Sequence, residues 1–386
     1  SYSGSNGKMA ANFGQRAFAY TPPTGYKALN TFNTDTPLID DPSLYFDTTK
    51  YTGDHPTGQS ITNLNFNPDL VWIKDRDGTN WHYVFDSIRG VEKGIFTNEN
   101  NAESTYSNTL TAFNSDGFTV GSDNATNESG NKMVAWAWDA GSSAAADNTD
   151  GSITSSVKAN TSTGFSIVSY TGEGTSGDDI GHGLNAAPSF VLIKNRDQGD
   201  GWAAMHTGSE VSGDNIVNTS VAEYYMLYLN ESNGRANWTG DVVAPNGSDK
   251  LTLGSGGMVN TDTKAYIAYC WSEVEGFSKF GSWDGNNSSD GPFVHTNFRP
   301  AFLLWKRSNG SANWYIYDSS RSTVNVVNDN LEPNTADAEN ILTSMNVDFT
   351  SNGFKIRGSD GDINGSGGTY VYAAFAKTPF KYSNAI

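Results

Sequence analysis

The chain repeats one stretch of sequence three times. The copies read PDLVWIKDRDGTNW (68–81), PSFVLIKNRDQGDGW (188–202) and PAFLLWKRSNGSANW (300–314). Each copy starts at a proline, has a lysine six residues later and reaches a tryptophan after 13 or 14 residues. The prolines lie 120 and 112 residues apart, a period too long for a propeller blade or a solenoid repeat. Each copy is therefore expected to belong to a unit with its own core.

Further matches on both sides of this stretch define the units. A phenylalanine precedes each copy, at Phe46, Phe165 and Phe277, and each unit closes on an apolar run, MVAWAW (133–138), YIAYCW (266–271) or YVYAAF (370–375). We expect repeats at 41–141, 164–275 and 276–386. Residues 1–40 form an N-terminal segment, and 142–163 form a linker with an opening strand.

The pattern within each unit predicts an all-β fold. Runs such as FTVGS alternate apolar and polar residues, as half-buried strands do, whereas DLVWIK and FVLIK are continuously apolar, as central strands are. The 41 glycines and 12 prolines fit tight turns between short antiparallel strands. We expect three tandem β-sandwiches in series, of the jelly-roll or concanavalin kind, with a barrel as the alternative and one short helix at 335–342.

Charge and composition exclude several function classes. The net charge is −18 and the basic residues are scattered, which argues against nucleic acid and against an anionic membrane surface as partners. The sequence has no apolar run of 18 residues, so no membrane insertion is expected. The single cysteine, Cys270, lies in an apolar run and is expected to be a buried, inert thiol.

Two parts of the sequence resemble known families. Residues 155–197, which include GFSIVSYTG, GHGL and IKNRD, are similar to a repeated domain of virion proteins from tailed, marine-type bacteriophages. NFGQRAFAYTPPTGYKAL (12–29) resembles the closing strand of a SPRY-like β-sandwich. The resemblance implies a structural or adhesive virion protein, such as a tail fibre, a spike or a capsid decoration. Its expected partners are other virion proteins, itself in a homo-oligomer, and a host surface glycan.

The chemistry-bearing residues follow no catalytic pattern, so we expect no enzyme. The five histidines match no nucleophile triad, and the acids fall in turns without the apolar surroundings that a glycosidase acid needs. His82 and His206 are expected to be strand residues that point outward. The alternatives to a virion protein are a secreted lectin-like protein and, after it, a capsule-degrading enzyme.

Two kinds of binding site stay open at this point. No cofactor is required, but Ca²⁺ would suit the oxygen-rich turns at Asp75 and Asp77 and at Asp360 and Asp362. Trp238 and Trp283 are the candidates for stacking against a sugar ring. The repeated tryptophans, Trp81, Trp202 and Trp314, are expected to occupy equivalent places in the three cores.

Overall fold

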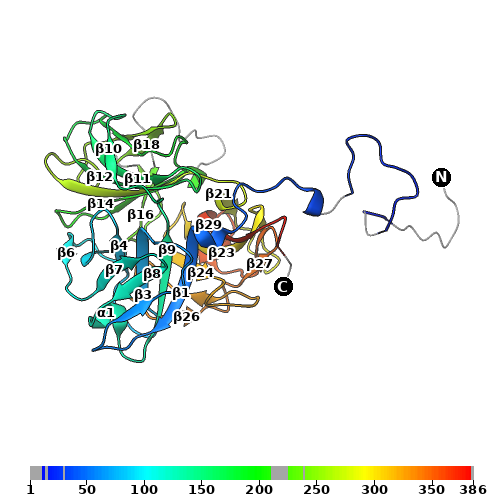
Figure 1. The fold of residues 1–386 in the computed structure, drawn as a ribbon, viewed down its shortest axis with the longest axis horizontal. Helices are drawn as coiled ribbons and strands as arrows, with labels where there is room; N and C mark the ends of the chain where they lie inside the picture. Colours follow the sequence, from blue (N-terminus) through cyan, green and yellow to red (C-terminus); the bar gives the residue numbers. More distant parts are fainter. Residues whose placement is uncertain (1–10, 14–15, 29–30, 210–224, 238–239, 384–386) are drawn as a thin grey trace.

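Antiparallel sheets make up almost all the regular structure in this computed structural model, which describes residues 11–13, 16–28, 31–209, 225–237 and 240–383 (Figure 1). The helical elements of the described part are single turns: η1 (Thr31–Asn33), η2 (Pro42–Leu44), η3 (Thr207–Ser209), α1 (Asn124–Asn127) and α2 (Gly361–Asn364). The predicted all-β class and antiparallel pairing are confirmed.

Unit 1 (41–141) has a large and a small sheet. The large sheet has the strand order β1-β9-β3-β4-β5-β6, and the small sheet has the order β2-β8-β7. The strands are β1 (Phe46–Thr52), β2 (Gln59–Ile61), β3 (Leu70–Asp75), β4 (Tyr83–Asp86), β5 (Lys93–Phe96), β6 (Ser104–Thr105), β7 (Leu110–Asn114), β8 (Gly117–Val120) and β9 (Lys132–Trp138).

Unit 2 (164–275) repeats this order as β12-β20-β14-β15-β16-β17 and β13-β19-β18. Two linker strands, β10 (Ala146–Asn148) and β11 (Ser155–Asn160), extend the large sheet beyond β12. The strands of the unit are β12 (Phe165–Thr171), β13 (Asp179–Gly181), β14 (Phe190–Asn195), β15 (Trp202–His206), β16 (Tyr225–Tyr228), β17 (Ala236–Asn237), β18 (Val243–Asn246), β19 (Lys250–Leu253) and β20 (Ala265–Trp271).

Unit 3 (276–380) repeats the order a third time, as β21-β29-β23-β24 and β22-β28-β27, with β25 and β26 as a separate ribbon. Its strands are β21 (Ser278–Asp284), β22 (Phe293–His295), β23 (Phe298–Arg307), β24 (Trp314–Asp318), β25 (Asp329–Asn330), β26 (Asn340–Ile341), β27 (Val347–Thr350), β28 (Gly353–Ile356) and β29 (Thr369–Pro379). Each unit is β-sandwich-like, with a large and a small antiparallel sheet.

The central strands are buried on both faces. In β3, Val71 and Ile73 face a core between the two sheets of unit 1, whereas Leu70 and Trp72 face a different core. This second core takes residues from the large sheets of all three units. Continuous apolar runs such as LVWIK therefore cover two cores at once.

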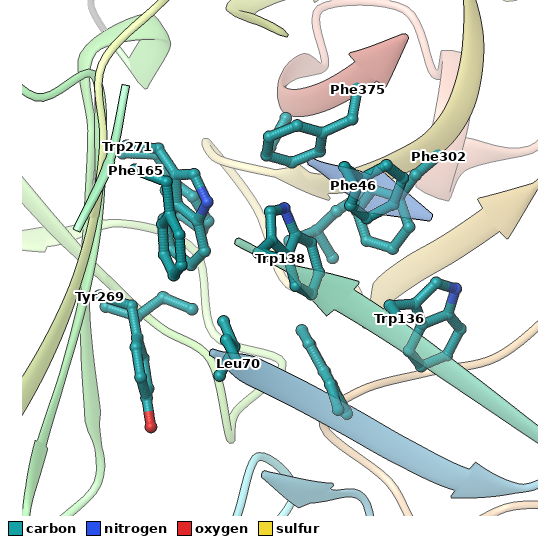
Figure 2. Packing of buried hydrophobic residues seen from close by; sticks show 14 of the residues in the cluster. Phe46, Leu70, Trp136, Trp138, Phe165, Tyr269, Trp271, Phe302 and Phe375 are labelled. Atoms are coloured by element: carbon teal, nitrogen blue, oxygen red, sulfur yellow. The ribbon is translucent and has the colours of Figure 1, made fainter. Parts of the chain in front are cut away.

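The shared core corrects the expectation of units in series. The closing aromatic residues of the units, Trp138, Trp271 and Phe375, meet there, with ring centroids 6.0 Å apart for Trp138 and Trp271 and 5.6 Å apart for Trp138 and Phe375 (Figure 2). Because one face of each large sheet is mostly apolar, the three sheets stabilise one another by packing around one centre. The units form one body with an approximate three-fold arrangement.

The strand registers give this body two distinct ends. At the connector end, β3 begins opposite Trp138, where β9 ends, and the chain passes from unit to unit. At the turn end lie the turns 76–82, 196–201 and 308–313, which join β3 to β4, β14 to β15 and β23 to β24. The helix expected at 335–342 is absent: this segment lies along a neighbouring turn, where the Glu339 amide donates to the Arg76 carbonyl oxygen at 2.7 Å.

Candidate functional site

The recurring lysines, Lys74, Lys194 and Lys306, are buried at the ends of β3, β14 and β23. Each ammonium group donates to carbonyl oxygens of its own turn, as Lys74 does to Asp75 at 2.6 Å and Gly78 at 2.9 Å. Burial lowers the pKa of each lysine to about 8. The lysines therefore hold the turns in place from within.

Two of these lysines also bind the preceding unit. Lys194 donates to the Asn100 carbonyl oxygen of unit 1 at 3.2 Å, and Lys306 donates to the Ser232 carbonyl oxygen of unit 2 at 3.0 Å. Each bond crosses from one unit to the unit before it. The interfaces are thus head-to-tail, which is the kind of contact that closes a ring.

The residues opposite the lysines correct the assignment of the repeated tryptophans. Trp202 lies opposite Lys194 and Trp314 opposite Lys306, but the register of β3 and β4 places His82 opposite Lys74. The three residues also share a hydrogen bond from their backbone N–H to an asparagine side-chain oxygen. His82 donates to Asn98, Trp202 to Asn230 and Trp314 to Asn334. Trp81 lies half-buried in the core of unit 1 instead.

The two indoles bind across unit boundaries. The Trp202 indole nitrogen donates to the Phe96 carbonyl oxygen of unit 1 at 2.6 Å, and that of Trp314 donates to the Tyr228 carbonyl oxygen of unit 2 at 2.8 Å. Both tryptophans are buried in the shared core. Trp202 and Trp314 are core residues, as predicted, but they belong to one core shared by the units and not to separate cores.

The two histidines near the repeat tryptophans point inward, which overturns the prediction that they face outward. His82 accepts a hydrogen bond at Nδ1 from the Trp72 indole at 3.0 Å, and burial holds its pKa well below the usual value. His206 has Nε2 2.9 Å from the Tyr372 carbonyl oxygen, and burial lowers its pKa to about 4. Both are neutral residues of the interior at neutral pH.

Buried ion pairs fill the interface between units 1 and 2. The Arg89 guanidinium lies between the Asp86 carboxylate and Glu103, with a nitrogen 3.1 Å from Glu103. Arg196 of unit 2 pairs with the same Glu103 at 2.9 Å, and the Tyr269 hydroxyl of unit 2 donates to Asp86 at 2.7 Å. Burial tends to raise the pKa of Glu103, but its hydrogen bonds to the arginines lower it overall.

The interface between units 3 and 1 repeats this cluster. Arg321 pairs with Asp318 at 2.5 Å and with Glu339 at 3.0 Å, and Arg76 of unit 1 pairs with Glu339 at 2.5 Å. The Trp136 indole of unit 1 donates to Asp318 at 3.1 Å, and the Arg321 guanidinium lies 5.5 Å from the Trp136 ring centroid. Paired, hydrogen-bonded charges are the form in which ions are tolerated in an interior.

The interface between units 2 and 3 has different residues at these places. In the first two interfaces, the Glu103 backbone N–H donates to the Arg196 carbonyl oxygen and the Glu339 backbone N–H donates to the Arg76 carbonyl oxygen. The equivalent bond between units 2 and 3 runs from the Arg235 backbone N–H to the Ser308 carbonyl oxygen. Arg235 therefore stands where the glutamate is, and Ser308 where the outer arginine is. Asp86 lies opposite Leu70 in unit 1, and Asp318 lies opposite Phe302 in unit 3. In unit 2 the equivalent strand position is Phe190, and the residue opposite it is His206 instead of an aspartate. Within the part of the chain that the structure describes, the interface between units 2 and 3 therefore lacks the Asp–Arg–Glu cluster.

These clusters were not predicted from the sequence, although the sequence contains a signal for them. FDSIR (85–89) and YDSSR (317–321) share Asp-Ser-x-Arg, directly after the repeated tryptophan strand, whereas unit 2 has MHTGS (205–209). In both copies the aspartate accepts the arginine amide three residues on and pairs with its side chain. The motif occurs in the two units whose Asp–Arg pairs take part in clusters between units, and it is absent at the equivalent position of unit 2.

The first pair of proposed calcium ligands is already satisfied by donors. The Asp75 carboxylate is buried and accepts the amides of Asp77 and Gly78, both at 3.0 Å, and the Asn80 side-chain amide at 2.9 Å. Asp77 accepts the Lys132 amide at 2.8 Å. The two aspartates organise the turn after β3.

The second pair serves a helix cap. Asp360 is the N-cap of α2 and accepts the Asp362 amide at 2.9 Å, while Asp362 accepts the Tyr315 hydroxyl at 2.7 Å. Within the described ranges, no group of three His, Cys, Asp or Glu side chains is placed to hold a metal ion. The residue types predicted for calcium are present, but their oxygens face N–H and O–H groups.

The proposed sugar-stacking residues are not brought together. Trp238 lies outside the described residues. Trp283 is 6% exposed, stacks on Tyr370 at 5.2 Å and donates from its indole to the Ile363 carbonyl oxygen at 2.9 Å. The core of unit 3 therefore covers the ring face that a sugar would need.

Cys270 is buried, as predicted, and burial raises the pKa of its thiol to about 12. Among the described residues, no helix has the length and apolar character needed to cross a membrane.

Comparison with known proteins adds one result. No curated protein and no solved structure matches the chain. One family model matches residues 41–379, and so spans all three units as one domain. The chain belongs to the family described as a domain of unknown function, DUF7483.

Proposed function

We propose that this chain is a non-enzymatic structural or adhesive component of a bacteriophage virion, in a tail fibre, a spike or a capsid decoration. The proposal rests on where the polar residues that recur between units make their contacts. The turn lysines and the Asp–Arg–Glu clusters bind other parts of the same chain, within and between units. Sequence conserved between repeats thus serves the rigidity of the body, as a displayed module requires.

The surface and the sequence resemblance support the same proposal. A net charge of −18 favours solubility and resists non-specific association. The resemblance of residues 155–197 to virion domains of tailed phages supports a phage particle as the place of this chain.

We also propose a finer ancestry for the parts. Each unit derives from one two-layer sandwich of the jelly-roll or concanavalin kind, which the threefold recurrence of one strand order supports. Residues 1–40 end a SPRY-like sandwich. In support, the described residues of the arm that leaves the body in Figure 1 expose the aromatic side chains of Phe18, Tyr20 and Tyr26, which a neighbouring sheet would cover.

The two ends of the body suggest an orientation on the particle. The N-terminal arm and the C-terminal tail meet at the connector end, where the Lys381 ammonium group donates to the Thr34 carbonyl oxygen at 2.7 Å. Attachment to other virion proteins, and to further copies of this chain, would use this end. The turn end, with exposed Asp77, Asp197 and Asn309, would face a host surface glycan.

Immunogold electron microscopy of purified particles tests the virion assignment. An antibody raised against the full chain should label particles from a culture in which the gene is expressed, and mass spectrometry of those particles should detect the chain. Antibody pre-absorbed with the pure protein is the control. Particles that lack the chain by both measurements would refute the proposal.

Binding to host cells tests the orientation. The fluorescently labelled chain should bind cells, and D77K/N309K/D197K at the turn end should weaken binding more than D35K/D40K/E275K at the connector end. Equal loss in both variants would contradict the orientation. Saturable sugar binding by a chain absent from particles would favour the lectin-like alternative, and shortening of host polysaccharide would favour the enzyme.

A further inference from the structure

A largely buried lysine of the linker lies against an acid of unit 1. Lys158 belongs to β11, and its ammonium nitrogen is 2.5 Å from Oδ1 of Asp69, the residue before β3. The two side chains are 16% and 2% exposed, whereas those of the pair Lys250–Asp179 are 32% and 16% exposed. Among the lysine–carboxylate pairs of the described residues, Lys158 and Asp69 are the least accessible to water.

The carboxyl group of Asp69 is fixed through both of its oxygens. The Ser87 hydroxyl donates to Oδ1 at 2.6 Å, and the Ala140 backbone N–H donates to Oδ2 at 2.9 Å. The backbone of Asp69 is held as well, because its N–H donates to the Trp138 carbonyl oxygen at 2.8 Å. The carboxyl group is therefore kept in one orientation, with Oδ1 toward Lys158.

A second acid lies next to this pair. Strand alternation places Lys158 and Asn160 on the same face of β11, and the Asn160 side-chain amide donates to Asp139 at 2.8 Å. The pKa of Asp139 is raised, mainly by burial, and the charge of Asp69 acts in the same direction. Two carboxyl groups thus face one ammonium group, and Asp139 is the one that retains a proton more readily.

Neither acid recurs in the other units. The equivalent positions are Ser189 and Ala301 for Asp69, and Ser272 and Ala376 for Asp139. The described chain also passes from β20 to β21 without a strand that corresponds to β11. The core of a unit therefore does not need these residues, and their meeting is specific to the joint between the linker and unit 1.

We propose that Lys158 and Asp69 condense to an isopeptide bond, an amide between Nζ and Cγ, with Asp139 transferring the protons. The Nζ–Cγ bond forms and the Cγ–Oδ1 bond breaks. Oδ1 leaves as water with two of the three ammonium protons. An ammonium and a carboxylate become an amide and a water molecule, so the reaction needs no oxidant, reductant or further reactant.

The contacts around the pair match the steps of this condensation. Asp139 as a carboxylate takes a proton from Nζ, and as an acid it gives one to the leaving Oδ1, to which the Ser87 hydroxyl also donates. The Ala140 N–H at Oδ2 stabilises the negative charge of the tetrahedral intermediate. Fixed proximity raises the effective concentration of the amine, and the apolar neighbours Trp138 and Ala140 limit access of water.

Mass spectrometry of the denatured full chain tests the bond directly. After incubation in the folded state, the parent protein should weigh one water molecule less than its sequence requires. Digestion should give one branched peptide that joins the segments containing Lys158 and Asp69. Lys250 and Asp179 are the internal control, since this more exposed pair should stay uncondensed. A full sequence mass, or a water loss that maps to other residues, would overturn the proposal.

Lys158→Arg is the matched variant, because a guanidinium keeps the ion pair with Asp69 but does not condense with a carboxylate. It should keep the full sequence mass and the circular dichroism spectrum of the parent. Asp139→Asn should form the bond roughly a hundredfold more slowly, in a time course that starts from cell-free synthesis. Water loss in Lys158→Arg would refute the bond, and an unchanged rate in folded Asp139→Asn would refute the part given to Asp139.

Discussion

The indole of Trp202 in unit 2 donates a hydrogen bond to the backbone oxygen of Phe96 in unit 1, at 2.6 Å. Trp314 repeats the relationship one unit later with Tyr228, at 2.8 Å. A residue that recurs in the sequence therefore acts between units as well as within them. Loss of the tryptophan side chain should therefore weaken the packing of one unit against the next.

We expect Trp202→Phe to lower the free energy of unfolding by about 1–3 kcal/mol, because the Phe96 carbonyl oxygen loses its donor in a buried interface. Urea unfolding followed by fluorescence measures the change. Trp81→Phe is the control and should cost less, since Trp81 is half-buried and lies in the core of its own unit. Equal costs would argue against an interface role.

Arg321→Met should destabilise the protein by about 3–5 kcal/mol, because Asp318 would be left as a buried carboxylate without its cation. The ion pair between the exposed Arg357 and the partly buried Asp348 provides the comparison, and Arg357→Met should cost about 1 kcal/mol or less. Adding Asp318→Asn to Arg321→Met should recover part of the loss. No recovery would mean that the unpaired charge is not the main cost.

Stability should fall as the pH drops from about 6.5 toward about 4. Burial lowers the pKa of His182 and His206 to about 4, so the unfolded chain binds protons in this window that the folded chain does not. Each histidine should remove roughly 2 kcal/mol between pH 7 and pH 5. His206→Gln should show a shallower slope of unfolding free energy against pH; an unchanged slope would contradict the burial of that ring.

Cys270 should report global opening. Its thiol is buried and its pKa is raised to about 12, so an aromatic disulfide reagent should not react with the native protein at pH 8. The reaction should become complete in denaturant, with the same midpoint as the fluorescence transition. Rapid labelling under native conditions would show that β20 opens on its own.

The sequence predicted the strands better than their assembly. The alternating and apolar runs identify β3, β14 and β23, because period and turn residues are local signals. The shared core was missed since a continuously apolar strand fits a single sandwich as well as it fits two cores. The segment 335–342 was expected to be helical, but the contact of Glu339 with Arg76 holds it extended.

The candidate site shows the same limit at the level of residues. Matching tryptophan letters aligned Trp81 with Trp202, whereas counting the same number of residues from the lysine across the strand pair gives His82, because the turns have equal length and Trp81 stands one position earlier. Asp75 has the right chemistry for calcium, but amide N–H groups of its own turn take its oxygens. Sequence alone does not show which donors will surround an acid.

The shared core predicts that the three units unfold together. Separating unit 2 from units 1 and 3 would expose Phe190, Leu192 and Trp271 of unit 2, which belong to the core shared by the three units. The full chain should therefore give one cooperative calorimetric transition, whose calorimetric and van't Hoff enthalpies agree. Residues 164–275 expressed alone should aggregate or stay unfolded, with exposed apolar surface that binds a hydrophobic dye, because half of the apolar burial of the large sheet is lost. A soluble, monomeric fragment with its own sharp transition would restore the view of independent modules, and three separate transitions in the full chain would do the same.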